Sequence, residues 1–431
     1  MWPIINPVHI HTAPTVESVP TGGTWSFPLL MAFTCVLLLS PQSFISALRP
    51  LHIAFITAGL AALAYALDRF RCHQALVPLT RPTVLMLALL GLAIFTVPLS
   101  IWPGGSFTFL TSFYLKALII FFLLSHVVDT PQKLKFTAAA LSMIAIPLAL
   151  SGVTGFLSGG FASQELSRGL DRIAGYNGSL TSNPNDLALM LDLILPLSVA
   201  LFLDSRRTAW RLLLLASMGL SLVGVVATYS RGGFVTLGVI ALVYLWLLLR
   251  HGRTSLVFAA CILLLITVPM LPGGYAHRLA TITDIQSDPT GSAQQRWAEM
   301  RDATEYVLNH PLIGVGVGQN ALALNQVDGG TWEEVHNVYL QYAMELGIPG
   351  LVLFLLLMRE CLRGAKRAKR ARDAPSSLKL LAEGLWISLI AFAVSGFFYP
   401  DGYQFYFYYM AALAIAAQSI AARSTSTRAA A

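Results

Sequence analysis

The chain has 431 residues, of which 56% are hydrophobic and only 11% are charged. Soluble globular proteins carry about 25% charged residues, so this composition excludes that class. Together with a mean hydropathy of +0.67, it predicts an all-α polytopic membrane protein. A net charge of +7 would suggest nucleic-acid binding in a soluble protein, but here the basic residues follow the membrane topology, so no nucleic acid is expected.

Apolar runs predict about twelve transmembrane helices, arranged in three parts along the chain. Residues 1–271 are expected to hold the first nine, with an outer loop at about 157–186. Residues 272–335 form a large loop, and residues 336–431 hold the last three helices, with a basic inner loop at 359–379. The predicted spans are 25–40, 51–67, 82–99, 107–128, 136–156, 187–203, 210–229, 233–249, 255–271, 338–358, 380–399 and 404–422.

The basic residues predict the orientation of these helices. If both termini are cytoplasmic, the inner segments hold 20 of the 28 Lys and Arg residues. The outer segments then hold seven, and these include Arg168, Arg172, Arg231 and Arg296. This asymmetry places the large loop outside the cytoplasm. The basic run at 359–379 is explained by topology and contact with membrane lipids.

Arg231 is one of the basic residues that the topology rule disfavours in an outer segment. It lies in Ser230-Arg231-Gly232-Gly233, a tight junction between two predicted spans. The glycines permit close approach of backbone and ligand, so Arg231 is a candidate phosphate ligand. The alternative is an interfacial arginine that extends from a helix end towards the membrane surface.

The outer loop at 157–186 contains two further arginines and an Asn-Pro-Asn turn. Arg168 and Arg172 are four residues apart and would share a helix face, where they could contact substrate. Asn183 and Asn185 flank Pro184 directly before a predicted span. Their amides could cap that helix or hold a sugar or phosphate.

The large loop contains a predicted amphipathic helix over Ser292–Asn309, with Trp297, Met300, Ala303, Tyr306 and Val307 as its apolar stripe. Arg296 lies on this helix and could pair with Glu299 or Asp302, or bind a substrate phosphate. The glycine run that follows, residues 314–318, lacks the strand and the Lys-Ser/Thr ending of a nucleotide-binding loop, so that function is not expected.

His336 follows the loop and begins the next predicted span. A histidine there can be a simple capping or interfacial residue, but its pKa also suits it to accept a proton at neutral pH. Glu333 and Glu334 are close enough in sequence to orient it or to contact substrate, as is Asn337. Glu345 is interpreted as a structural group, and Gly347 and Pro349 predict a break in the helix. The outer acids are dispersed, so no metal site is expected.

In order and spacing, these motifs resemble the O-antigen ligase/polymerase superfamily of bacterial inner-membrane glycosyltransferases. The resemblance covers roughly residues 183–354. It is carried by these pieces: Asn183-Pro184-Asn185, Ser230-Arg231-Gly232-Gly233, Arg296-Trp297, His310-Pro311-Leu312-Ile313-Gly314-Val315-Gly316, His336-Asn337 through Leu340, Glu345, Gly347 and Gly350-Leu351. It implies a GT-C-type fold, a metal-independent and inverting reaction, no cofactor, and an active site at the periplasmic face of the inner membrane.

The resemblance also implies substrates and residue roles. The donor would be an undecaprenyl-diphosphate-linked O-antigen, and the acceptor a hydroxyl of lipid A-core. His336 would accept the proton of that hydroxyl, and Arg231 and Arg296 would bind the diphosphate. A polymerase, whose acceptor is a second lipid-linked glycan, and a protein O-glycosyltransferase remain open within the family. A lipid-linked glycan flippase is the alternative outside it.

Overall fold

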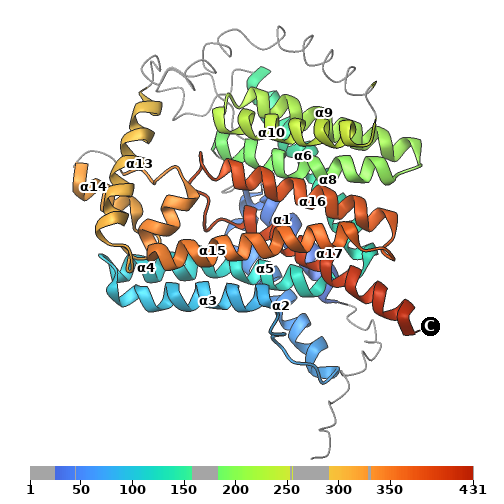
Figure 1. The fold of residues 1–431 in the computed structure, drawn as a ribbon, viewed down its shortest axis with the longest axis horizontal. Helices are drawn as coiled ribbons and strands as arrows, with labels where there is room; N and C mark the ends of the chain where they lie inside the picture. The colour runs from blue at the N-terminus through green and yellow to red at the C-terminus, as the bar shows by residue number, and fades with distance from the viewer. Residues whose placement is uncertain are drawn as a thin grey trace, which may run out of the picture.

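The structure is a computed structural model that describes residues 25–43, 45–157, 183–252, 255, 291–328 and 332–430. Within these ranges the regular secondary structure is entirely helical (Figure 1). The α-helices are α1 Ser26–Leu39, α2 Ile53–Arg71, α3 Arg81–Thr96, α4 Pro103–Phe109, α5 Leu115–Val127, α6 Pro131–Leu157, α8 Pro184–Asp204, α9 Thr208–Ala227, α10 Arg231–Arg250, α13 Ser292–Asn309, α14 Asn320–Asp328, α15 Val338–Arg370, α16 Ser376–Ser395 and α17 Phe405–Ala430.

Ten helical segments of the described chain are long and apolar enough to cross a membrane. They match ten of the predicted spans, with α4 and α5 joined through a π-helical turn at Leu110–Tyr114 into one continuous segment. The first predicted span is α1, which has only 14 residues. The ninth, 255–271, lies outside the described residues. The all-α polytopic membrane class is therefore confirmed.

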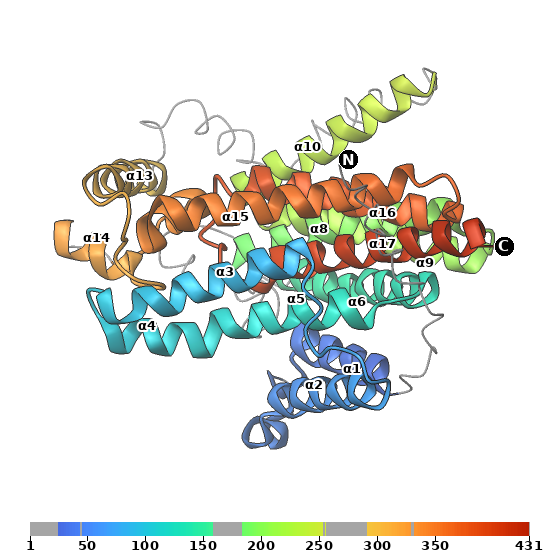
Figure 2. The same cartoon turned by 60° about the horizontal axis from the view of Figure 1, so that its bottom comes forward.

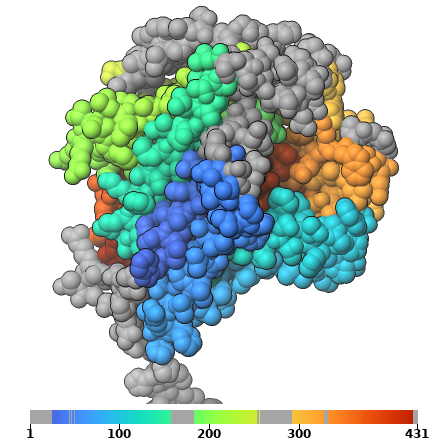
Figure 3. Space-filling model, turned by 180° about the vertical axis from the view of Figure 1, so that it is seen from behind, coloured from blue at the N-terminus to red at the C-terminus, as the bar shows by residue number. Residues whose placement is uncertain are grey.

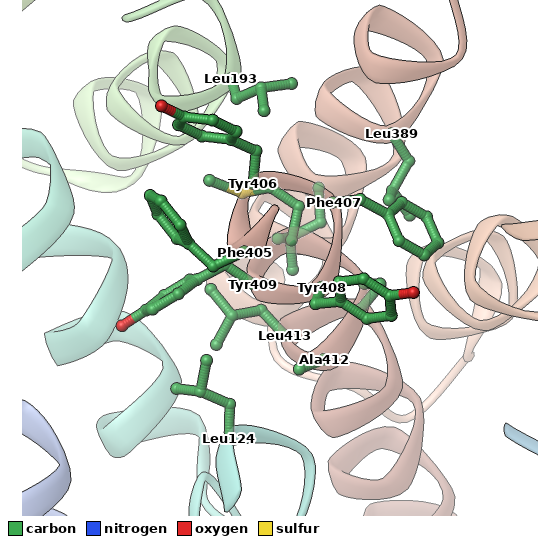
Figure 4. Close-up of a cluster of buried hydrophobic side chains, with 14 of the residues drawn as sticks. Leu124, Leu193, Leu389, Phe405, Tyr406, Phe407, Tyr408, Tyr409, Ala412 and Leu413 are labelled. Atoms are coloured by element: carbon green, nitrogen blue, oxygen red, sulfur yellow. The ribbon is translucent and has the colours of Figure 1, made fainter. Parts of the chain in front are cut away.

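The centre of the bundle is built by α8, α15, α16 and α17, in which α16 packs against the other three and α15 packs against α17. The start of α17 brings the aromatic run Phe405–Tyr409 into this centre, where Tyr408 and Phe407 are fully buried (Figure 4). Tyr408 lies within hydrogen-bonding distance of Tyr342 in α15, 2.7 Å between the hydroxyl oxygens. A stacked ring pair of Tyr342 and Phe354 extends the contact along α15. These large side chains fix α15 and α17 relative to each other.

The outer layer of the bundle is apolar and poorly covered. Helices α1 and α2 pack against each other and lie over α5 and α6, at the surface seen in Figure 3. Large apolar side chains such as Phe55, Phe70 and Phe95 are more than half exposed. In water such a surface would aggregate, whereas hydrocarbon lipid tails suit it, so this layer is the lipid-facing one.

Helix α13 coincides with the amphipathic helix predicted over Ser292–Asn309. Its buried face differs from the expected stripe, because it consists of Glu299, Asp302, Ala303 and Val307. Trp297 is 62% exposed and therefore does not belong to that stripe. Ala303 and Val307 pack in a small apolar cluster with Val335, Ala343 and Met344, while Glu299 on the same face contacts His336.

The predicted break in α15 occurs at Gly347, whose φ of 72° and ψ of 179° are not helical. The break frees backbone groups, and the chain at 311–316 bonds to them. Met344 and Glu345 carbonyls accept the amides of Val315 and Gly316 at 2.9 and 3.0 Å, and Ile348 donates to the Pro311 carbonyl at 2.8 Å. Pro349 has no N–H, so the Glu345 carbonyl would have lacked a helical partner in any case. This pairing attaches the large loop to α15.

Glu345 completes that attachment. Its buried carboxylate accepts the Gly318 amide at 2.7 Å and also the Asn320 side chain. Asn320 in turn accepts the Val335 amide at 2.8 Å through its side-chain oxygen. A chain of hydrogen bonds therefore runs from α15 through the start of α14 to the residue before His336.

Candidate functional site

His336 lies in the short segment before α15 and faces α13. Its Nδ1 is 3.1 Å from Oε2 of Glu299, and the histidine side chain is only 17% exposed. Glu299 is nearly fully buried, and its Oε1 has no hydrogen-bond partner within the described part of the chain. The carboxylate at hydrogen-bonding distance from His336 is thus Glu299, and the candidate ligand atom of Glu333 lies within 4.8 Å of the histidine. Tertiary packing of α13 decided this pairing.

Helix α13 connects the three predicted catalytic residues along one face. Ser292 lies 3.5 Å from an Nη atom of Arg231, at the start of α10. Arg296, one turn later, is close enough to Tyr399 to act on its ionisation. Glu299 then binds His336. Positions 292, 296 and 299 have the spacing of one helix face, so α13 brings its polar face to all of them. It lies at one end of the bundle, opposite the C-terminus (Figures 1 and 2).

The junction before α10 is a hydrogen-bonded unit built around Ser230. Its hydroxyl caps the helix by accepting the Gly233 amide, donates to Oδ1 of Asn185 at 2.8 Å, and is 3.0 Å from the Tyr399 hydroxyl. A Cβ on Gly232 would meet Tyr399 at 2.9 Å. The glycines of this junction therefore admit protein neighbours, and the Arg231 side chain extends to Ser292 of α13.

Two of the predicted substrate-binding asparagines serve as helix caps. Asn183 accepts the Asn185 amide at 2.9 Å at the start of α8, and Asn337 accepts the amides of Tyr339 and Leu340 at the start of α15. Each cap fixes the entry of a helix at the same end of the bundle. Asn185 joins the Ser230 junction instead, and this brings α8 to Arg231. Substrate contact by these three residues stays a prediction.

Tyr399 and Asp401 are site residues that the sequence analysis missed. Both lie between α16 and α17 and are buried. Burial raises the pKa of Asp401 well above its ordinary value, and repulsion from Asp186 and Glu334 adds to the effect. Burial likewise raises the pKa of Tyr399, which the Ser230 hydrogen bond and the charge of Arg296 oppose. Tyr399-Pro400-Asp401-Gly402, a polar turn between two apolar spans, was the signal available in the sequence.

Glu299, Glu333 and His336 form a group whose potential ligand atoms lie within 4.8 Å of one another. Such a set offers one nitrogen and two carboxylate oxygens, which is a chemically reasonable set for a divalent cation. The sequence analysis expected no metal site, because the outer acids are far apart along the chain. The fold brings two of them beside His336.

Arg168 and Arg172 lie outside the described residues, as do 272–290 and 329–331 of the large loop. Substrate contact by Arg168 and Arg172 therefore stays a prediction. The described residues nevertheless gather His336, Arg231 and Arg296 at one end of the bundle, from three segments that are remote in sequence. Asn185, Glu333 and Glu334 lie at the same end.

The fold and this site define a multi-pass, all-α membrane protein with a polar site at one end of its helix bundle. A sequence model described as O-antigen ligase matches residues 216–355. The matched segment begins in α9, ends in α15, and contains Arg231, Arg296 and His336. Over these residues the chain is similar to the O-antigen ligase family. No curated protein matches the chain.

Proposed function

We propose that this protein is an O-antigen ligase that transfers a glycan from undecaprenyl diphosphate to a hydroxyl of lipid A-core. The observation that carries the proposal is the arrangement of α13, which links the segments of His336 and Arg231 and carries Arg296 itself. One proton acceptor and two fixed cations are what transfer from a lipid diphosphate requires. The match to the O-antigen ligase family supports the substrate class.

In the proposed reaction His336 is the base. The Nδ1–H of the neutral imidazole donates to Glu299, so Nε2 carries the lone pair. Nε2 accepts the proton of the acceptor hydroxyl. The hydroxyl oxygen attacks the anomeric carbon from the face opposite the diphosphate. The bond between that carbon and the diphosphate oxygen breaks, and the configuration inverts. Arg231 and Arg296 stabilise the charge that develops on the departing undecaprenyl diphosphate.

The membrane supplies both substrates. We propose a GT-C-type glycosyltransferase in the bacterial inner membrane, with both termini in the cytoplasm and the site at the periplasmic face, where lipid-linked donor and acceptor meet. With this orientation, 20 Lys and Arg residues fall in cytoplasmic segments and only seven in periplasmic segments, which is the asymmetry that membrane proteins favour. At a face without nucleotides, the energy comes from the glycan–diphosphate bond, and the protein contributes positioning and proton transfer.

The acceptor class is tested by reconstitution. Purified protein in lipid vesicles receives the lipid-linked donor with lipid A-core, with a second lipid-linked glycan, or with a protein acceptor. Transfer to lipid A-core alone is the expected result. Extension of the second glycan would identify a polymerase, and a modified protein would identify a protein O-glycosyltransferase. Deletion of the gene is expected to leave lipid-linked polymer that is not joined to lipid A-core.

The metal-independent part of the proposal has its own test, because Glu299, Glu333 and His336 could accept a cation. In the same reconstituted reaction, an excess of EDTA is expected to leave the rate unchanged. A loss of activity that added Mg²⁺, Mn²⁺ or Ca²⁺ restores would show that this group binds a metal required for transfer, and His336 would then be a ligand instead of a base.

A further inference from the structure

A groove follows α15 at the end of the bundle opposite His336. Apolar side chains line its first part, and basic side chains line the rest. The residues are Leu355, Met358, Arg359, Leu362, Arg363, Lys366 and Trp386, continuing to Arg367, Arg370 and Ala371. The basic part is an open depression with a volume of about 490 Å³.

The lining of the groove changes along one face of α15. Arg359, Arg363, Lys366 and Arg370 are spaced by four, three and four residues, so they lie above one another on the helix surface. Leu355 precedes these cations on the helix and lies nearer the centre of the membrane, and Leu362 lies between Arg359 and Arg363. A helix face that passes from apolar to basic side chains near the end of a span matches the passage from acyl chains to headgroups.

Positive charge in the groove is only partly neutralised. Glu360 pairs with Arg363 at 3.3 Å and with Arg367 at 4.0 Å. Lys369, beside the groove, pairs with Glu383 at 2.7 Å and lies over the Trp386 ring. Within the described ranges, no carboxylate pairs with Arg359, Lys366 or Arg370, and all three are exposed. These three cations are available to an anionic ligand.

We propose that this groove binds an anionic phospholipid of the surrounding membrane leaflet. One acyl chain lies along Leu355, Leu362 and Trp386, and the headgroup phosphate contacts Arg359 and Lys366. Arg370 lies about 16 Å further along the helix axis than Arg359. A headgroup with two phosphates therefore engages more of these cations than a headgroup with one. This site is distant from the proposed transfer site and does not depend on its chemistry.

The experiment uses the full-length protein in detergent and counts bound lipid by native mass spectrometry after addition of cardiolipin, phosphatidylglycerol or phosphatidylethanolamine. The test variant is Arg359→Gln/Lys366→Gln/Arg370→Gln, which removes three cations without leaving a carboxylate unpaired. The matched control Arg71→Gln/Arg81→Gln/Arg207→Gln removes the same charge from other exposed inner positions. A further variant, Leu362→Trp, fills the apolar part of the groove and leaves the charge unchanged.

The expected result is retention of cardiolipin above phosphatidylglycerol, and of both above phosphatidylethanolamine. The triple groove variant and Leu362→Trp should each lower the cardiolipin-bound fraction at least about fivefold, whereas the control triple variant should leave it unchanged. An equal loss in both triple variants, or no loss in either, would overturn the proposal in favour of diffuse surface charge. Equal displacement of cardiolipin by millimolar inorganic phosphate would overturn it in favour of a simple anion site.

Discussion

The two ends of the helix bundle use basic residues in opposite ways. At the His336 end, Arg231 and Arg296 lie among polar and acidic groups that the fold has gathered, with Ser292, Tyr399 and Glu299 as neighbours. At the other end, the cations of α15 lie exposed on one helix face. Composition and the proposed topology explain the second arrangement, because cytoplasmic loops favour Lys and Arg whatever the function. The proposed contacts with a diphosphate would explain the first.

The largest effect is expected when one of the three proposed catalytic side chains is removed. His336→Ala, Arg231→Ala and Arg296→Ala are each expected to lower the rate of glycan transfer at least about 100-fold, because each removes proton transfer or charge stabilisation from the transition state. The measurement is transfer in vesicles, with the amount of folded protein checked by size-exclusion chromatography. Arg207→Ala at the inner end is the matched control and should keep wild-type activity. Full activity in any of the three would refute its assigned role.

Glu299→Gln tests how the outer end positions its histidine. The amide can still contact Nδ1 but no longer imposes the same proton arrangement, so kcat should fall at least about tenfold while KM for the donor stays unchanged. Glu299→Asp should restore part of the rate. Glu333→Gln and Glu334→Gln are the controls, since the sequence placed them equally near His336. If either control lowers kcat more than Glu299→Gln does, the assignment of Glu299 is wrong.

The attachment of the large loop is tested at Gly347. A Cβ there would lie 2.5 Å from the Leu312 carbonyl oxygen, and the residue has a φ of 72°. Gly347→Ala is therefore expected to cost about 1–3 kcal/mol and to lower the Tm of the purified protein. Gly219→Ala in α9 is the control, because nothing lies within 4 Å of its Cβ position. That change should leave the Tm equal or slightly raised. Equal loss in both variants would contradict the role of the break.

The smallest expected effect concerns Asp401, whose pKa is raised by burial and by repulsion from Asp186 and Glu334. A carboxyl group with a raised pKa in the folded state binds its proton more tightly there, so stability falls as pH rises from about 4 towards the folded pKa. Asp401→Asn removes this penalty. Its Tm should exceed that of the wild type by a few degrees at pH 8, and the difference should shrink towards pH 4.5. A difference that is independent of pH would exclude this account.

Much of the molecule followed from the sequence alone. In a membrane, an apolar run of spanning length has to form a helix, because only a helix satisfies the backbone hydrogen bonds within the run itself. Ten spans and the all-α polytopic membrane class could therefore be predicted. Local signals also sufficed for α13 and for the break at Gly347, because an amphipathic period and a Gly-Ile-Pro-Gly stretch act within a few residues. Arg231 and Arg296 became candidates because basic residues are disfavoured in outer segments, and His336 because its pKa suits it to accept a proton.

Tertiary structure alone decided which groups meet. Glu299 and His336 are 37 residues apart in the chain, and nothing in the sequence favoured Glu299 over Glu333, which is three residues from His336. The pairing depends on how α13 packs against α15, which depends in turn on the backbone bonds freed at Gly347. Likewise, Tyr399 and Asn185 join Ser230 because α8, α10 and the turn after α16 converge. Residue types set what chemistry is available, and packing over long sequence distances sets which side chains share it.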